Sequence, residues 1–230
     1  YEMRTCLVGS EMCIRDRSVH IGSQILSDVP YKKMLNVMSN LIKELKLDLK
    51  FLDLGGGFGI RYNEKDKLIN LKKYSDSVNK LAKKLKCKII FEPGRSIIGD
   101  TGILLSKIQY IKKGAKKDFI IIDAGMNDFM RPALYDAVHK IIPIRKSKSK
   151  LKGTIEFVGP ICESTCKFGS YKNYQKMSEN DFVAITNVGA YGSSLSSNYN
   201  SRPLIAELLV NKNKIKYIRK KQDLLKLINS

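Results

Sequence analysis

The chain contains 230 residues, of which 43% are hydrophobic and 28% charged, a composition that excludes a disordered or fibrous protein. No apolar run approaches the roughly 20 residues that a membrane-spanning helix needs, so we expect no membrane partner. The net charge of +20 comes mainly from 33 lysines, which are spread along the chain and are not interleaved with aromatic residues that stack on bases. We therefore expect a solvated lysine-rich surface and no nucleic-acid partner.

Residues 1–18 differ in composition from the rest of the chain. They hold three of the nine arginines and two of the five cysteines but no lysine, and they show neither strand nor helix periodicity. A short tail of different origin and an expression or sequencing junction both fit this pattern, and the junction is our preferred interpretation. We expect residues 1–18 to be a foreign or artefactual segment.

Strands and helices alternate from residue 19 onward. Residues 19–23 read as the end of a strand that passes into a loop, and Asp28 is expected to cap a helix with Pro30 in its first turn. The expected apolar face of this helix consists of Tyr31, Leu35, Met38, Leu41, Ile42 and Leu45. The apolar run 51–54 then predicts a buried strand that ends in the glycine-rich turn 55–59.

A second helix and a third strand follow. The helix is marked by Tyr74, Val78, Leu81, Ala82 and Leu85. The strand, residues 88–91, ends at the motif 92–95. This order of strands and helices indicates a parallel β/α arrangement, in which functional residues lie at the carboxyl ends of the strands. We expect residues 19–102 to form this part.

Beyond residue 102 the pattern changes to short runs rich in Ile, Val, Phe and Tyr, separated by Gly, Asn, Pro and Lys. The runs lie at residues 103–111, 119–123, 154–158, 182–186, 205–210 and 214–219. Such spacing is typical of an antiparallel sheet or a small barrel. We therefore expect residues 103–230 to form a second, mostly β domain.

Several short motifs carry candidate functional residues, and each also has an ordinary structural explanation. The turn 55–59 either lets backbone amides approach an anion or is a tight turn without a ligand, and it does not fit the dinucleotide motif G-x-G-x-x-G. Glu92 and Arg95 either bind a ring nitrogen and an anion or form a surface ion pair. His20 is catalytic or simply half-buried, and Cys162 exchanges protons or packs as a small hydrophobe.

Cysteine and histidine usage bears on compartment and metals. The five cysteines are too few and too scattered for a disulfide framework, and they fit a reducing, cytoplasmic environment. The chain has two histidines and no Cys-x-x-Cys pair, so we expect no metal site.

Taken together, eight motifs resemble those of the diaminopimelate decarboxylase family and occur in the same order. They are residues 20–24, 55–59, 92–95, 125–128, 131–135, 162–164, 189–192 and 197–203. The resemblance covers residues 19–230 of this chain and the C-terminal half of the family's enzymes. These enzymes have the alanine-racemase-like fold III of pyridoxal phosphate decarboxylases. It implies an α/β plus all-β fold: the C-terminal part of a cofactor-binding (β/α)8 barrel, followed by an antiparallel β-barrel domain.

The resemblance also implies an activity, the decarboxylation of meso-2,6-diaminopimelate to L-lysine and CO2, and a cofactor, pyridoxal 5'-phosphate. By similarity, His20 stacks on the cofactor ring, Ser23 and the turn bind its phosphate, and Glu92 keeps the ring nitrogen protonated. The implied cofactor-binding residues are His20, Ser23, Gly55, Gly56, Gly57, Glu92, Pro93, Gly94, Arg95 and Tyr191.

The substrate-binding residues implied by the resemblance are Arg95, Arg131, Tyr135, Glu163 and Tyr191. Arg131 and Glu163 match the two charges at the distal end of the amino-acid substrate, and Cys162 protonates the carbon that loses CO2. The family completes its site across a homodimer, with the Cys162 loop reaching into the barrel of the partner subunit. A cytoplasmic homodimer is therefore expected.

Three departures from the family pattern stand out. Polar residues 15–18 replace an apolar strand, and Cys166 occupies the position of an aspartate. The lysine that forms the Schiff base lies in the earlier barrel strands, and no lysine of this chain has a matching context. Because about three of eight barrel strands are present, we expect the isolated chain to be poorly soluble and inactive.

Two alternatives remain. One is a related decarboxylase of arginine, ornithine or carboxynorspermidine, although Arg131 and Glu163 argue against simple diamine precursors, which lack the distal carboxylate. The other is an inactive remnant that serves as a basic binding module.

Overall fold

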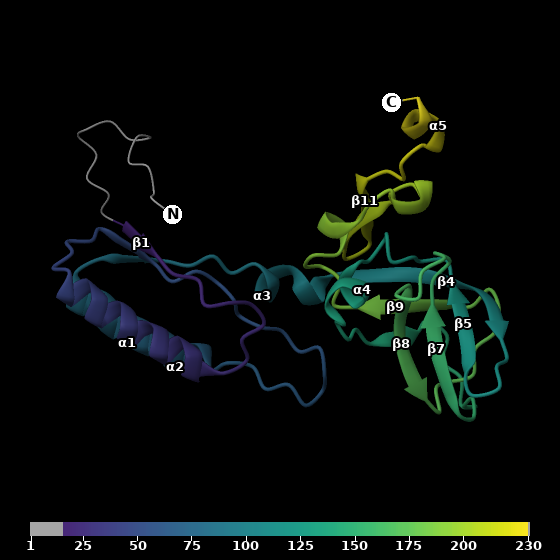
Figure 1. Ribbon diagram of the computed structural model, residues 1–230, viewed down its shortest axis with the longest axis horizontal. Coiled ribbons are helices and arrows are strands. Elements are labelled where there is room, and N and C mark those ends of the chain that lie inside the picture. Colours follow the sequence, from purple (N-terminus) through teal and green to yellow (C-terminus); the bar gives the residue numbers. More distant parts are fainter. Residues whose placement is uncertain (1–15, 230) are drawn as a thin grey trace. The chain divides into compact units, whose positions relative to one another are not determined.

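The computed structural model describes residues 16–229, which fall into two compact units (Figure 1). The first unit ends at Ser96 and the second begins at Ile97, whereas the sequence predicts a boundary after residue 102. Most of the predicted foreign segment, residues 1–15, lies outside the described residues. Residues 16–18, the last three of the predicted segment, form a strand.

The first unit contains a three-stranded parallel sheet in the order β1-β2-β3. Its strands are β1 (Asp16–Ser18), β2 (Phe51–Asp53) and β3 (Lys88–Ile90). The polar side chains of β1 are exposed, and this strand joins the sheet through its backbone and through a 3.4 Å hydrogen bond from the Ser18 hydroxyl to the Asp53 carboxylate. Because all three strands run the same way, their carboxyl ends meet at one edge, as the alternation of strands and helices predicts.

Two helices, α1 (Asp28–Glu44) and α2 (Leu71–Leu85), pack side by side in the first unit (Figure 1). The cap of α1 is Ser27, not Asp28 as predicted: the Ser27 hydroxyl accepts a hydrogen bond from the Val29 amide. Asp28 instead forms an ion pair with Lys32, at 2.6 Å, one turn along.

The buried face of α1 also differs from the predicted one. It consists of Tyr31, Met34, Leu35, Met38 and Ile42. Leu41 and Leu45, which the periodicity places in the core, are 40% and 55% exposed because the stripe follows Met34 instead. On α2 the predicted core residues Tyr74, Val78 and Leu81 are buried.

An aromatic cluster joins the helices to the edge of the sheet. The ring of Tyr31 is fully buried, and its centroid lies 5.2 Å from that of Phe58 and 4.8 Å from that of Tyr74. The Tyr31 hydroxyl donates a 2.9 Å hydrogen bond to the carbonyl of Gly56. The core of the first unit is thus bonded directly to the glycine-rich turn.

The second unit begins within the short helix α3 (Arg95–Ile98), which is followed by a 3-10 turn at Gly99–Thr101. Its six-stranded sheet has the order β6-β9-β4-β5-β7-β8. The strands are β4 (Ile103–Lys112), β5 (Asp118–Ile122), β6 (Ile141–Pro143), β7 (Thr154–Val158), β8 (Lys167–Lys172) and β9 (Phe182–Thr186). The helix α4 (Arg131–Tyr135) lies between β5 and β6 in the chain.

The sheet of the second unit is mixed rather than purely antiparallel, which corrects the predicted fold. Strands β5 and β7 run parallel, whereas the other four pairings are antiparallel. Parallel neighbours require a long crossover, and here it contains α4 and β6. Apolar side chains of β4, β5, β7 and β9, with Phe129 and Phe168, form the core of this unit.

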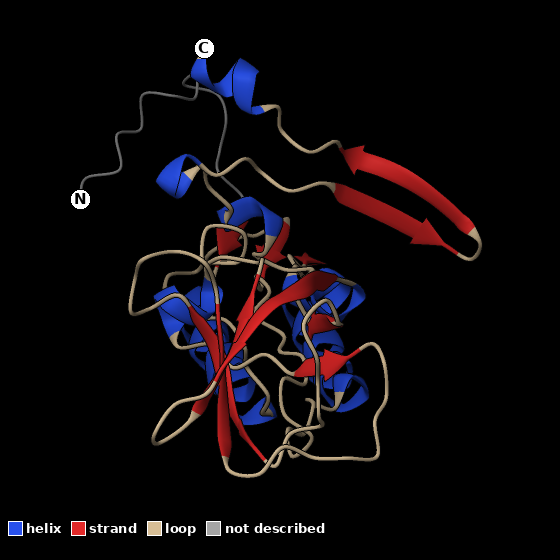
Figure 2. Ribbon diagram, turned by 90° about the vertical axis from the view of Figure 1, so that its right-hand side faces the viewer, coloured by secondary structure: helices blue, strands red, loops and turns tan. Residues whose placement is uncertain are grey.

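The remaining elements are β10 (Glu207–Asn211), β11 (Lys214–Arg219) and α5 (Leu224–Ile228). The two strands form a separate antiparallel hairpin, visible as a two-stranded ribbon in Figure 2. Its apolar side chains are exposed, Val210 to 65% and Ile215 to 69%. In residues 16–229, no helix has the length and apolar character needed to cross a bilayer.

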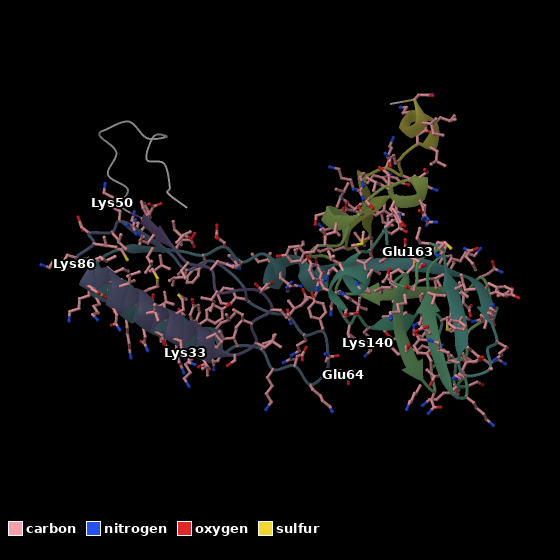
Figure 3. The ribbon with its side chains drawn as sticks, in the orientation of Figure 1. Lys33, Lys50, Glu64, Lys86, Lys140 and Glu163 are labelled. Carbon is pink, nitrogen blue, oxygen red and sulfur yellow. The ribbon has the colours of Figure 1, made fainter. Side chains whose placement is uncertain are left out.

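Lysines of the first unit lie on its surface. Lys33, Lys50 and Lys86 are exposed and point away from the ribbon (Figure 3). Such side chains keep their charged ends in water while their stems cover apolar surface.

Candidate active site

The three strand ends of the first unit bring together the residues that the sequence predicts to bind a cofactor. Backbone hydrogen bonds continue the sheet past its strands. The Val19 amide donates to the Asp53 carbonyl at 3.0 Å, and the Glu92 amide donates to the Gly55 carbonyl at 2.9 Å. The loop after β1 carries His20 and Ser23, the loop after β2 carries residues 55–57, and the loop after β3 carries residues 92–94 and leads to Arg95, the first residue of α3.

The glycine-rich turn touches both neighbouring loops so closely that no side chain fits. A Cβ on Gly56 would lie 2.1 Å from the Glu92 carbonyl oxygen, and a Cβ on Gly57 would lie 2.2 Å from that of Gly22. Gly57 also has a φ of +86°, a conformation that favours glycine. The turn therefore lies between the loops after β1 and β3 and contacts both.

A hydrogen bond from the glycine-rich turn orients His20. The amide of Gly56 donates to His20 Nδ1 at 3.3 Å, so Nδ1 is the acceptor in this contact. The Asp53 carboxylate accepts from the Gly55 amide at 2.8 Å. His20 is exposed, so one face of an oriented ring is available to a ligand.

Arg95 is the buried cation of this group, with 9% of its surface exposed. Its guanidinium donates to the Ser23 hydroxyl at 3.0 Å and to the Tyr62 hydroxyl at 2.6 Å. A guanidinium and a hydroxyl held together in this way suit a phosphate or carboxylate group. Glu92 is exposed, and no Cβ on Gly94 would meet a neighbour within 4 Å.

The second unit brings together Arg131, Tyr135 and Tyr191. Arg131 opens α4 and is 8% exposed, with its guanidinium carbon 5.8 Å from the ring centroid of each tyrosine. Arginine in contact with aromatic faces gains cation–π attraction and loses freedom. Tyr191 has a φ of +58°, a conformation that costs a non-glycine residue about 1–2 kcal/mol.

The loop after β7 presents Cys162 and Glu163, both exposed (Glu163 is labelled in Figure 3). The Tyr199 hydroxyl donates a hydrogen bond to the Glu163 carboxylate. This bond, strengthened by the carboxylate charge, raises the pKa of Tyr199 above its ordinary value. Cys162 also lies close enough to contribute to that rise.

Cys166, whose role the sequence leaves open, anchors this loop. It is 3% exposed, and its sulfur accepts a hydrogen bond from the Met126 amide at 3.4 Å. Its own amide donates to the Glu163 carbonyl at 3.0 Å. The residue that replaces an aspartate of the family pattern therefore belongs to the packing of the loop and not to its exposed chemistry.

The motif 197–203 has a structural part in this unit. Arg202 donates to the Asn127 side chain at 3.1 Å, to the Asp123 carbonyl at 2.8 Å and to the buried Asp128 carboxylate at 3.3 Å. These bonds join the motif to the turn 125–128. Both motifs thus position the loops that carry the candidate site residues.

Sequence reasoning missed three residues that contact predicted site residues: Tyr62, His139 and Tyr199. His139 accepts a hydrogen bond from Arg131. Tyr62 accepts one from Arg95, and Tyr199 donates one to Glu163. Tyr199 lies inside a recognised motif, and this was the one available signal. Tyr62 and His139 are single polar residues in loops with no periodicity.

Comparison with known proteins identifies relatives that match most of the chain. Diaminopimelate decarboxylases from Aquifex aeolicus and Helicobacter pylori are 42% and 43% identical to the chain over 207 and 209 residues. Each alignment covers 89% of this chain but 49% and 51% of the relative. The chain therefore spans about half the length of the curated relatives it matches.

Solved structures agree. The crystal structure of diaminopimelate decarboxylase from Helicobacter pylori complexed with L-lysine matches with a TM-score of 0.83 and 40% identity, over 93% of this chain and 53% of that one. The enzyme from M. jannaschii in complex with L-lysine matches with a TM-score of 0.82 and 34% identity, over 91% of this chain and 50% of that one. The resemblance predicted from the eight motifs is confirmed.

A family model described as pyridoxal-dependent decarboxylase, C-terminal sheet domain, matches residues 12–189. This range includes β1 and the first six of the eight motifs. It ends at Gly189, the first residue of the seventh motif. The chain belongs to the pyridoxal-dependent decarboxylase family.

Proposed function

We propose that this chain is the C-terminal half of a decarboxylase that converts meso-2,6-diaminopimelate to L-lysine and CO2. The observation that carries the proposal is the pair of charged side chains in the second unit. Arg131 lies near two tyrosine rings, and Glu163 accepts a hydrogen bond from Tyr199. Diaminopimelate keeps an amino group and a carboxylate at the end remote from the reaction, and these two charges match Arg131 of one subunit and Glu163 of its dimer partner.

The residues of the first unit fit pyridoxal phosphate. Ser23, Arg95 and the turn 55–57 offer a hydroxyl, a cation and a closely packed backbone to the phosphate. Glu92 would accept a hydrogen bond from the protonated ring nitrogen, and the oriented His20 ring would lie against the cofactor ring. When bound, pyridoxal phosphate supplies an electron sink for the charge left by departing CO2. Pro93 and Gly94 carry the backbone between Glu92 and Arg95.

Cys162 is the proposed proton donor. Its thiol is exposed on a loop whose base is fixed by Cys166, so it can reach a substrate carbon while the loop stays in place. Protonation at that carbon completes L-lysine. Tyr191 would contact both the cofactor and the substrate, and Tyr135 would contact the substrate beside Arg131.

The assembly is a cytoplasmic homodimer with a shared site. The exposed positions of Cys162 and Glu163 support a role for this loop in the barrel of a partner subunit. The three parallel strands are part of a (β/α)8 barrel, and the curled mixed sheet is part of the C-terminal β-barrel domain. In this arrangement residues 19–102 belong to the first domain and residues 103–230 to the second.

The test uses the completed enzyme, meaning residues 19–230 joined to the N-terminal half of the barrel from the source gene or from the Helicobacter pylori relative. CO2 release is measured with pyridoxal phosphate and, in turn, meso-diaminopimelate, L-ornithine, L-arginine and carboxynorspermidine. We expect release from diaminopimelate, with L-lysine formed in equal amount. Preference for any other substrate, or no release from diaminopimelate, would overturn the proposal.

A further inference from the structure

His139 is a buried polar residue that the proposed function leaves unused. It follows α4 by four residues, and 1% of its surface is exposed. Its ring meets that of Phe129 edge to face, with centroids 4.6 Å apart and planes at 85°. A histidine so enclosed must have its ring nitrogens satisfied, because an unpaired buried polar atom is costly.

The two ring nitrogens have partners of opposite kind. Nδ1 lies 2.9 Å from the carbonyl oxygen of Thr186, which can only accept, so Nδ1 carries a proton. Nε2 lies 3.3 Å from Nε of Arg131, which always carries a proton, so Nε2 must accept. One neutral tautomer, with its proton on Nδ1, satisfies both contacts.

This contact determines which edge of Arg131 can bind a carboxylate. A guanidinium binds a carboxylate in bidentate fashion either through Nε and one Nη or through its two Nη atoms. Because Nε already donates to His139, the first edge is engaged within the protein. The rings of Tyr135 and Tyr191 lie near the guanidinium, each 5.8 Å from its central carbon, and limit its rotation.

We propose that His139 is a positioning residue that holds Arg131 so that its two Nη atoms bind the distal carboxylate of the substrate end-on. The inference rests on the proposed function and adds to it the orientation of the carboxylate. His139 acts as a neutral hydrogen-bond acceptor. Its ring is held in position by the Thr186 carbonyl and by Phe129. Substrate affinity then depends on an atom that never touches the substrate.

Two substitutions separate the two contacts of the ring. In His139→Asn the side-chain amide takes the place of Nδ1 and donates to Thr186, but the shorter side chain does not reach Arg131. In His139→Gln the side-chain oxygen takes the place of Nε2 and accepts from Arg131. The completed enzyme is assayed for inhibition by L-lysine, which retains the distal carboxylate, and by cadaverine, which lacks it.

The asparagine variant should raise the inhibition constant for L-lysine about tenfold, as expected for losing a hydrogen bond to a charged group. The KM for diaminopimelate should rise with it, while kcat stays within about twofold. The glutamine variant should restore most of the L-lysine affinity. Inhibition by cadaverine should be the same in wild type and both variants, because that ligand has no carboxylate for Arg131.

Unchanged inhibition by L-lysine in His139→Asn would overturn the proposal, and so would an equal loss of cadaverine binding, which indicates general loosening of the site. Neutron diffraction from crystals of the wild-type completed enzyme gives a second test that needs no variant. A proton on Nε2 instead of Nδ1 refutes the proposal. Failure of the proposed function is distinguishable, since the wild type would then release no CO2 from diaminopimelate.

Discussion

Gly56 provides the sharpest test of how the glycine-rich turn builds the candidate site. In Gly56→Ala the new methyl group would lie 2.1 Å from the Glu92 carbonyl oxygen. Carbon and oxygen atoms without a covalent link normally stay about 3.3 Å or more apart, so the loops after β2 and β3 must separate by about 1 Å. The φ of Gly56 is not positive, and the effect is therefore purely steric.

The expected cost follows from this overlap. Forcing an extra methyl group into a packed site costs about 1–3 kcal/mol, and backbone atoms on both sides leave little room to relax. The shift also disturbs the bond from the Tyr31 hydroxyl to the Gly56 carbonyl, which anchors the turn to the core. We expect Gly56→Ala to lower the melting temperature of the cofactor-free completed enzyme by several degrees and to weaken pyridoxal phosphate binding.

Gly94→Ala is the matched control for stability. Gly94 lies in the adjacent loop, its φ is not positive, and an added Cβ would meet nothing within 4 Å. This substitution should leave stability unchanged or raise it by about 0.4–1 kcal/mol, because alanine restricts the unfolded chain. Equal melting temperatures and equal cofactor affinities for Gly56→Ala and wild type would refute the steric reasoning.

Three further predictions concern titration, the cysteines and Tyr199. Burial raises the pKa of Tyr31 and of Tyr74 from 10.0 to about 12, so the stability due to their protonated hydroxyls is complete below pH 10 and is lost as the pH rises to 12. The free energy of unfolding, measured by urea titration, should fall steeply over this range and fall less in Tyr31→Phe; a flat profile contradicts the burial argument. Cys162→Ser should lower kcat about 100-fold or more at an unchanged melting temperature, whereas Cys166→Ser should lower the melting temperature through its buried position and leave kcat within about twofold. The reverse pattern would show that the two thiols have been assigned to the wrong roles. Tyr199→Phe removes the hydrogen bond to the proposed substrate-binding carboxylate and should raise the KM for diaminopimelate about tenfold with little change in kcat, whereas an unchanged KM would refute a positioning role.

Local signals in the sequence predicted strands that are rich in Ile, Val, Phe and Tyr, whether they are buried, as β7 and β9, or exposed, as β11. The runs 154–158, 182–186 and 214–219 coincide with β7, β9 and β11. The runs failed where strands are short or polar: β6 has three residues, and β8 alternates lysine, glycine and serine with aromatic residues. The parallel pairing of β5 with β7 could not be predicted, because periodicity carries no direction.

The candidate site shows a similar division. The residues after the predicted strands could be found because parallel strands place their carboxyl ends at one edge. Their partners could not. Tyr62 is 33 residues from Arg95, and Tyr199 is 36 residues from Glu163, so only the tertiary fold joins them. Ser27 replaced Asp28 as the helix cap because both residue types cap helices and stand side by side.

The most direct test of the account is a crystal structure of the completed enzyme with pyridoxal phosphate and L-lysine. We predict the cofactor phosphate at Ser23, Arg95 and the turn 55–57, with the Glu92 carboxylate at the ring nitrogen. The L-lysine carboxylate should contact both Nη atoms of Arg131. A cofactor bound away from the glycine-rich turn, or an L-lysine carboxylate that does not contact Arg131, would contradict the central claim.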